Sequence, residues 1–314
     1  MPERFEIGPV GPYALASSVR FLEGFAPAAY EGIGQDGLRF AFVADGLADA
    51  EAVAGVRVRQ DQESGTVVGD VFGTADPEIV RRQVARILSL DVDGRGFPGV
   101  GSRDPVVAAL RRRYPGLRPV CFYSPYEAAA WAIIGNRVRI AQAAKVKARM
   151  AAELGPKVDM GDGLEHAFPG PSRLAELERF PGLSETKIER LKRLARVAGE
   201  GGLEADVLRS LPIEEAISRL RGLPGIGPFS AELVLLRGTG EPDHLPTNEP
   251  RLARAVARAY GLEKAPDAEE LRAMAEKWRP YRTWVALHLR AMLEETGEIS
   301  QAGRVREEKP TAKT

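Results

Sequence analysis

The pattern of apolar and polar positions divides this chain into two unlike parts. In the first hundred or so residues, short runs alternate between apolar and polar side chains and are flanked by Gly or Asp, which is typical of half-buried strands. Two helical patterns lie among them, at 17–25 and at 76–91, and the second has Asp76 as its N-cap and Pro77 at its first helical position. The pattern predicts an α+β domain with an antiparallel sheet. The predicted strands are FEIG from Phe5, LRFAFVA from Leu38, GVRVRQ from Gly55 and GTVVGDVFG from Gly65.

After the Gly- and Pro-rich stretch 94–105, apolar residues recur every three or four positions and strand signals almost disappear. We therefore expect a mainly α protein with an α+β domain at 1–105, an all-helical domain at 106–299 and a flexible tail at 300–314. The tail has almost nothing apolar to bury. The helical candidates are 124–155, 171–180, 184–201, 212–222, 228–240, 249–261, 267–278 and 281–297.

The composition is that of an ordinary globular protein. Of the 314 residues, 44% are hydrophobic and 28% charged, which excludes wholesale disorder. There is no apolar run of about 18 residues and the start lacks a secretory layout, so we expect a cytoplasmic protein without membrane insertion. Lys plus Arg equals 44 and so does Asp plus Glu, so any binding to nucleic acid has to come from local patches.

The residues that usually bind metals are scarce and scattered. One cysteine, Cys121, cannot form an internal disulfide or a cysteine cluster for zinc or iron–sulfur. The histidines, at 166, 244 and 288, lack the spacing of a metal-binding pattern. We expect no structural metal centre.

The most informative motif is RGLPGIGPFSAELVLLRG at 221–238, a helix-hairpin-helix signature. One helix ends at Gly222, a tight turn follows, and the next helix begins at Pro228. Gly225 and Gly227 can adopt backbone angles closed to other residues, and the turn amides with the positive helix end can bind a phosphate. The alternative is a plain αα-corner without a ligand. The predicted DNA contacts are Gly225, Ile226, Gly227 and Ser230.

A similar FPGL turn precedes a basic helix from residue 184. Ser184 can cap this helix, and Lys187, Arg190 and Lys192 are candidate phosphate contacts. Each of these cations could equally belong to an ordinary solvated face.

Three segments, in order and spacing, resemble the helix-hairpin-helix DNA glycosylases, most closely the bacterial 3-methyladenine DNA glycosylase II (AlkA) group. They are GLPGIGPFSAELVLLRG, HLPTNEPRLARAV and WRPYRTWVALHL, within a similarity that covers most of 110–295. The resemblance implies a monomeric base-excision repair enzyme that binds damaged double-stranded DNA, flips a damaged, alkylated purine out and hydrolyses its N-glycosidic bond. It implies no organic cofactor, with a candidate monovalent-cation site at 222–227.

The family's catalytic aspartate, after the hairpin, is missing here. The register of the following helix places that position on Glu249, whereas counting from the preceding Leu-Pro places it on Asn248. A carboxylate in a site with little water can stabilise an oxocarbenium-like sugar and activate water, so we favour Glu249. The alternative is a carboxylate that only stabilises the helix end before Pro250.

The resemblance also implies the pocket for the flipped base. The lysine that lets some lineages cut the backbone corresponds to Phe229, which implies a monofunctional enzyme, and a pocket tryptophan corresponds to Arg290. Stacking on aromatic rings holds a flipped base, although an aromatic at helical spacing is often simply core. The pocket candidates are Phe229, Tyr123, Tyr126, Trp131, Trp284 and Arg290.

Asn136 and Arg137 correspond to the family's wedge, which fills the gap that the flipped nucleotide leaves in the duplex. An exposed basic turn is the alternative. Arg251, Arg254 and Arg258 lie on one helical face beside the hairpin and form a local positive stripe.

The sequence is also compatible with two other functions. One is a lesion-binding protein of the same fold that does not cut, which the missing aspartate and the Trp-to-Arg replacement favour. The other is a hairpin that mediates only protein contacts, which no large apolar exposed face supports.

Overall fold

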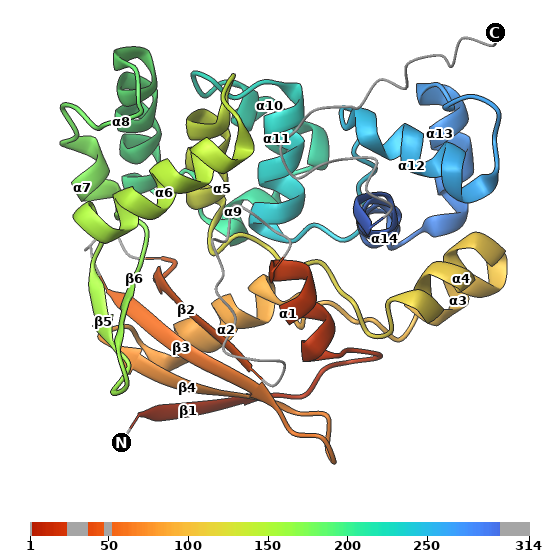
Figure 1. Ribbon diagram of the computed structural model, residues 1–314, viewed down its shortest axis with the longest axis horizontal. Helices are drawn as coiled ribbons and strands as arrows, with labels where there is room; N and C mark the ends of the chain where they lie inside the picture. Colours follow the sequence, from red (N-terminus) through yellow and green to blue (C-terminus); the bar gives the residue numbers. More distant parts are fainter. Residues whose placement is uncertain (1, 24–36, 47–51, 296–314) are drawn as a thin grey trace, which may run out of the picture.

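The computed structural model describes residues 2–23, 37–46 and 52–295, and in them a small sheet adjoins a larger helical region (Figure 1). Every strand pair in the four-stranded sheet is antiparallel, in the order β1-β4-β3-β2. The predicted mainly α fold with an N-terminal antiparallel sheet is therefore confirmed. The strands are β1 (Glu3–Ile7), β2 (Gly37–Val43), β3 (Val53–Gln60) and β4 (Val67–Gly73).

Helices α1 (Leu15–Glu23) and α2 (Pro77–Ile87) share the core of this sheet. The start of α2 is as predicted, since the Asp76 carboxylate accepts hydrogen bonds from the Glu78 and Ile79 amides and Pro77 takes the first position. The end of the helical pattern at 17–25 lies outside the described residues.

A second, two-stranded sheet was not predicted. Strands β5 (Lys157–Asp159) and β6 (Leu164–His166) form a hairpin that packs on the large sheet through Val158 and Met160, which contact a core with Ala41. Along β2, Ala41 alternates with residues of the α1–α2 core, so the hairpin covers the opposite face. Each strand has only three residues, which is too short for an alternation signal.

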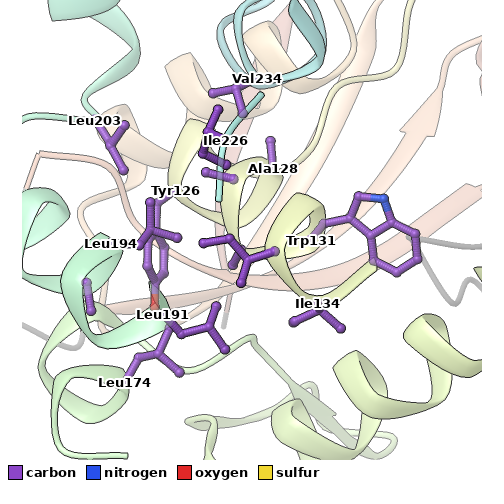
Figure 2. Packing of buried hydrophobic residues seen from close by; sticks show 14 of the residues in the cluster. Tyr126, Ala128, Trp131, Ile134, Leu174, Leu191, Leu194, Leu203, Ile226 and Val234 are labelled. Atoms are coloured by element: carbon purple, nitrogen blue, oxygen red, sulfur yellow. The ribbon is translucent and has the colours of Figure 1, made fainter. Parts of the chain in front are cut away.

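The helices from α5 to η2 form the first helical bundle, with one shared core (Figure 2). The predicted helical stretch 124–155 is two helices, because the chain turns at 136–139. The members are α5 (Pro125–Gly135), α6 (Ile140–Leu154), α7 (Pro171–Ala175), α8 (Glu185–Gly199), α9 (Ala205–Ser210), α10 (Ile213–Arg221), α11 (Pro228–Val234) and the π-helix η2 (Leu235–Thr239).

The remaining helices form the second helical bundle around another core, which includes Trp278 and Trp284. Its first helix was missed because its sequence, FPGVGSR, is rich in residues that usually break helices. Phe97, before the expected boundary near residue 105, packs in this bundle, and that boundary stays a prediction. The members are α3 (Phe97–Arg103), α4 (Pro105–Arg113), α12 (Pro250–Tyr260), α13 (Ala268–Ala275), the 3-10 helix η3 (Glu276–Trp278) and α14 (Arg282–Glu295).

Among the described helices, none is both long and apolar enough to cross a membrane. The expected tail at 300–314 lies outside the described residues.

Candidate active site

A pocket that is open to solvent lies where the two helical bundles meet. One wall comes from α11 and η2 of the first bundle, and the other comes from α14 and the N-terminus of α12 in the second. Its lining residues are Pro119, Phe229, Glu232, Leu233, Leu236, Arg237, Pro246, Glu249, Thr283, Ala286, Leu287 and Arg290. Three sequence candidates, Phe229, Glu249 and Arg290, therefore meet in one cavity.

Glu249 is the N-cap of α12, and its side chain is 5% exposed. Its carboxylate accepts hydrogen bonds from the Arg251 amide at 3.2 Å and from the Arg251 guanidinium at 2.7 and 2.9 Å. The guanidinium of Arg290 lies 3.4 Å from Oε2 of Glu249, the oxygen that Arg251 Nη2 also contacts. Burial raises the pKa of this carboxyl, but the Arg251 hydrogen bonds and the two positive charges outweigh it, so the pKa lies below its ordinary value. Glu249 is ionised at neutral pH.

The alternative position, Asn248, is exposed and does not line the pocket. Its backbone and side-chain amides donate to the buried carboxylate of Glu232, at 3.0 and 2.9 Å. Thr247 adds a third hydrogen bond to the same group. Glu232 therefore holds the loop that leads into Glu249. The sequence analysis missed this role, although the sequence shows Glu232 as a lone carboxylate in an apolar helix.

Arg237, on η2, is a second residue that the sequence reading missed. Its guanidinium is buried, lines the pocket and donates to the Val120 carbonyl. Burial lowers the pKa of Arg237 to about 10, so it stays charged at neutral pH.

Phe229 is 39% exposed at the pocket, whereas the other predicted aromatic residues of the pocket lie elsewhere. Tyr126 and Trp131 belong to the core of the first helical bundle, where the Tyr126 ring lies near leucines of α8 (Figure 2). Trp284 packs in the second bundle, and Tyr123 stacks on a phenylalanine of the sheet core. The prediction that these four residues line the pocket was therefore wrong. Their helical spacing indicated only that they are buried, and they pack in the cores.

The hairpin turn has the predicted shape at one of its two key glycines. Gly225 has φ +91°, and a Cβ there would come within 2.8 Å of Cδ of Arg190. Gly227, the N-cap of α11, has φ −89°, which any residue adopts. The prediction that this position needs a backbone angle closed to other residues was therefore wrong. A Cβ at Gly227 would meet nothing within 4 Å, so a side chain at this position would have open space. Ile226 is buried, and its amide donates to Leu223.

The predicted wedge lies in the turn between α5 and α6. Asn136 caps α5, and Arg137 is exposed with φ +57°, a left-handed angle that is costly for a residue with a side chain. The ammonium of Lys187 donates to the Ile134 carbonyl at 2.7 Å and so ties α8 to this turn. Ser184 caps α8 as predicted, by accepting from the Lys187 amide.

The remaining predicted DNA contacts differ in how far they are buried or bound to other residues of the protein. The guanidinium of Arg251 is bound to Glu249, which lines the pocket. Arg254 is half-buried on the same helix, and Ser230 is half-buried in the first turn of α11. In the described ranges, no three His, Cys, Asp or Glu side chains are grouped so as to hold a metal ion.

Comparison with known proteins gives consistent relatives, although no protein-family model matches the chain. It is 32% identical over 266 residues to the Escherichia coli DNA-3-methyladenine glycosylase 2, with 78% of this chain and 90% of that protein covered. It is also 31% identical over 211 residues to a Mycobacterium tuberculosis protein named probable bifunctional transcriptional activator/DNA repair enzyme AlkA. That match covers 67% of this chain but only 42% of the mycobacterial protein.

Two solved structures share the fold. The 3-methyladenine DNA glycosylase from Archaeoglobus fulgidus superposes with a TM-score of 0.77 at 24% identity, covering 95% of this chain and 100% of that one. The Clostridium acetobutylicum 8-oxoguanine glycosylase/lyase in complex with double-stranded DNA has a TM-score of 0.60 at 20% identity, covering 78% and 85%.

Proposed function

Because this chain belongs to the DNA-3-methyladenine glycosylase 2 family, we propose that it removes a damaged, alkylated purine from double-stranded DNA. It acts as a monomer and hydrolyses the N-glycosidic bond without cutting the backbone. The observation that carries the proposal is the buried, ionised carboxylate of Glu249 in a pocket that also holds Phe229.

In this proposal Glu249 stabilises the positive charge that develops on the sugar as the bond to the base breaks, and it accepts a proton from the attacking water. The side chain is one methylene longer than aspartate. Its carboxylate accepts a hydrogen bond from the Arg251 amide at the helix end, the contact that an N-cap aspartate also makes. The two arginines fix its orientation, and a fixed charge needs no rearrangement during the reaction.

The two turns of the first helical bundle serve DNA binding in the same proposal. The amides at the start of α11, beside the open side of Gly227, bind a phosphate. Arg137 enters the duplex beside the flipped nucleotide, and its strained backbone supports a functional role, since such strain gathers at functional sites. A monovalent cation at 222–227 would be bound by carbonyls of the hairpin turn, which keep a second lone pair even where they accept a hydrogen bond.

A lesion-binding protein that does not cut is the second candidate function. One observation favours it, because the charge of Glu249 is already compensated by Arg251 and Arg290. A carboxylate that is partly neutralised stabilises a cationic sugar less than a free one.

The experiment uses duplexes with one methylated purine, hypoxanthine or uracil, followed by alkali to reveal abasic sites. The parent should release a purine, and Glu249→Gln should lower the single-turnover rate by about 10²–10⁴-fold with DNA affinity nearly unchanged. The matched control is Glu263→Gln, which removes the same charge from an exposed residue away from the pocket and should keep the parental rate. Base release by Glu249→Gln at the parental rate would exclude Glu249 as the catalytic group, and tight lesion binding without release by the parent would favour the second candidate.

A further inference from the structure

The pocket holds a second buried carboxylate, which belongs to the hairpin helix α11. Glu232 is the fifth residue of that helix, and its side chain is 5% exposed. Its carboxylate accepts hydrogen bonds from the backbone amide of Asn248 at 3.0 Å, from the side-chain amide of Asn248 at 2.9 Å and from the Thr247 hydroxyl at 3.2 Å. Glu232 thus binds the two residues that directly precede Glu249.

The segment 244–248 runs between the two helical bundles and is held differently at its two ends. At the first end, the Thr283 hydroxyl of α14 accepts from the His244 amide and donates to the His244 carbonyl, and Leu245 packs in the core of the second bundle. At the other end, Thr247 and Asn248 are exposed and gain little from packing. Their place therefore depends on the hydrogen bonds to Glu232.

These hydrogen bonds are made to a charged acceptor. Burial raises the pKa of the Glu232 carboxyl, but the imidazole of His244, 3.6 Å away, and the Asn248 hydrogen bonds outweigh it. The pKa lies below its ordinary value, so Glu232 is ionised at neutral pH. Hydrogen bonds to an ionised group are about twice as strong as those between neutral groups. Glu232 therefore fixes the end of the segment more firmly than a neutral side chain would.

The place of Glu249 decides how well it can act in the reaction. A misplacement of about 1 Å can lower a rate by about a hundredfold. In the proposed function, the first turn of α11 binds a phosphate of the DNA, and Glu232 lies on that same helix. Glu232 therefore connects the helix that docks on the DNA with the residue that acts on the sugar, across the boundary between the two bundles.

We propose that Glu232 is a positioning residue, which holds Glu249 at a fixed place relative to the hairpin helix and so to the docked DNA. It acts through Thr247 and Asn248 on Glu249, and it contributes to the rate of base release without contributing to DNA affinity. This inference rests on the proposed glycosylase function.

The test measures the single-turnover rate of base release and, separately, the affinity for an undamaged duplex. Glu232→Ala should lower the rate by about 10- to 100-fold and change the affinity by less than about twofold, because the amides at the start of α11 are untouched. Glu232→Gln should stay within about threefold of the parental rate. Its amide oxygen can accept from the Asn248 backbone, and its NH₂ can donate to the Asn248 side-chain oxygen once that amide turns over.

The matched control is Asp104→Ala. Asp104 is also a buried carboxylate with several hydrogen bonds, from the Val106 amide and the Trp278 indole among others, but it lies in the second bundle and does not line the pocket. The control should lose stability and keep the parental rate.

A double-variant cycle separates positioning from a general loss of structure. In a Glu249→Gln background, Glu232→Ala should lower the rate by less than about twofold more, because its effect passes through a carboxylate that is already missing. Thermal melting checks that each variant folds. If Glu232→Ala does not fold, the double variant Thr247→Val/Asn248→Ala replaces it, since both residues are exposed. That variant should lower the rate at least threefold at unchanged affinity.

A parental rate in folded Glu232→Ala, or in the loop variant that replaces it, would overturn the inference and leave the glycosylase function in place. A full further loss in the Glu249→Gln background would do the same. Release of no base by the parent would remove the proposed function itself and the inference with it.

Discussion

Replacing Arg137 by glycine should make the protein more stable and less active. Arg137 holds φ +57° in an exposed turn. A left-handed angle costs a residue with a Cβ about 1–2 kcal/mol, and glycine removes that cost. Glycine also adds about 0.5–1 kcal/mol of unfolded-chain entropy to the cost of folding. The exposed guanidinium loses little packing, so the net gain in the free energy of unfolding is about 0.5–1 kcal/mol.

The same variant loses the side chain that we place in the duplex. Stacking of a side chain on a base is worth about 1–3 kcal/mol, which corresponds to roughly a 5- to 150-fold change in rate. The loss should appear with a fully paired duplex, where the flipped nucleotide leaves a gap. It should be small with a bubble, in which the damaged base is already unstacked.

The assay is the ratio of single-turnover excision rates on paired and bubble substrates at matched salt, together with denaturant unfolding. Arg137→Ala is the matched control, because it removes the same side chain but keeps a Cβ at the strained angle. Both variants should lower the rate ratio alike, and only the glycine variant should gain stability. An unchanged ratio would make Arg137 a surface residue, and a glycine variant less stable than the alanine variant would refute the strain argument.

Two further predictions follow from single positions. Gly227→Ala should fold normally, because φ at Gly227 is −89° and the added Cβ would meet nothing within 4 Å. The variant should nevertheless bind all duplexes several-fold more weakly in a fluorescence titration. Unchanged affinity would mean that the turn does not contact DNA. His288 is buried, and burial lowers its pKa from 6.5 to about 4, so the unfolded chain binds a proton first as the pH falls. The free energy of unfolding should therefore decline from about pH 6.5 down to pH 4, by roughly 2 kcal/mol at pH 5. In denaturant unfolding, His288→Gln should flatten that decline. An equally steep decline in the variant would contradict the assignment to His288.

The local elements were largely determined by the sequence. The cap at Asp76, the helical period of the second half and the turn glycine Gly225 act over a few neighbouring residues, and each is found where the pattern placed it. Several of the missed elements are short or rich in helix breakers, such as the hairpin at 157–166 and the helix Phe97–Arg103, but the helix Pro105–Arg113 was missed although it is neither. For these, packing against the rest of the molecule decided the structure over the weak local preference.

The composition of the pocket was decided by the tertiary structure. Periodicity shows that Tyr126, Trp131 and Trp284 are buried, but a period carries no information about what a buried face contacts. The charges around Glu249 depend on α14 bringing Arg290 beside the N-terminus of α12. That contact joins residues far apart in the chain, and it exists only because the second helical bundle packs these two helices together around one core.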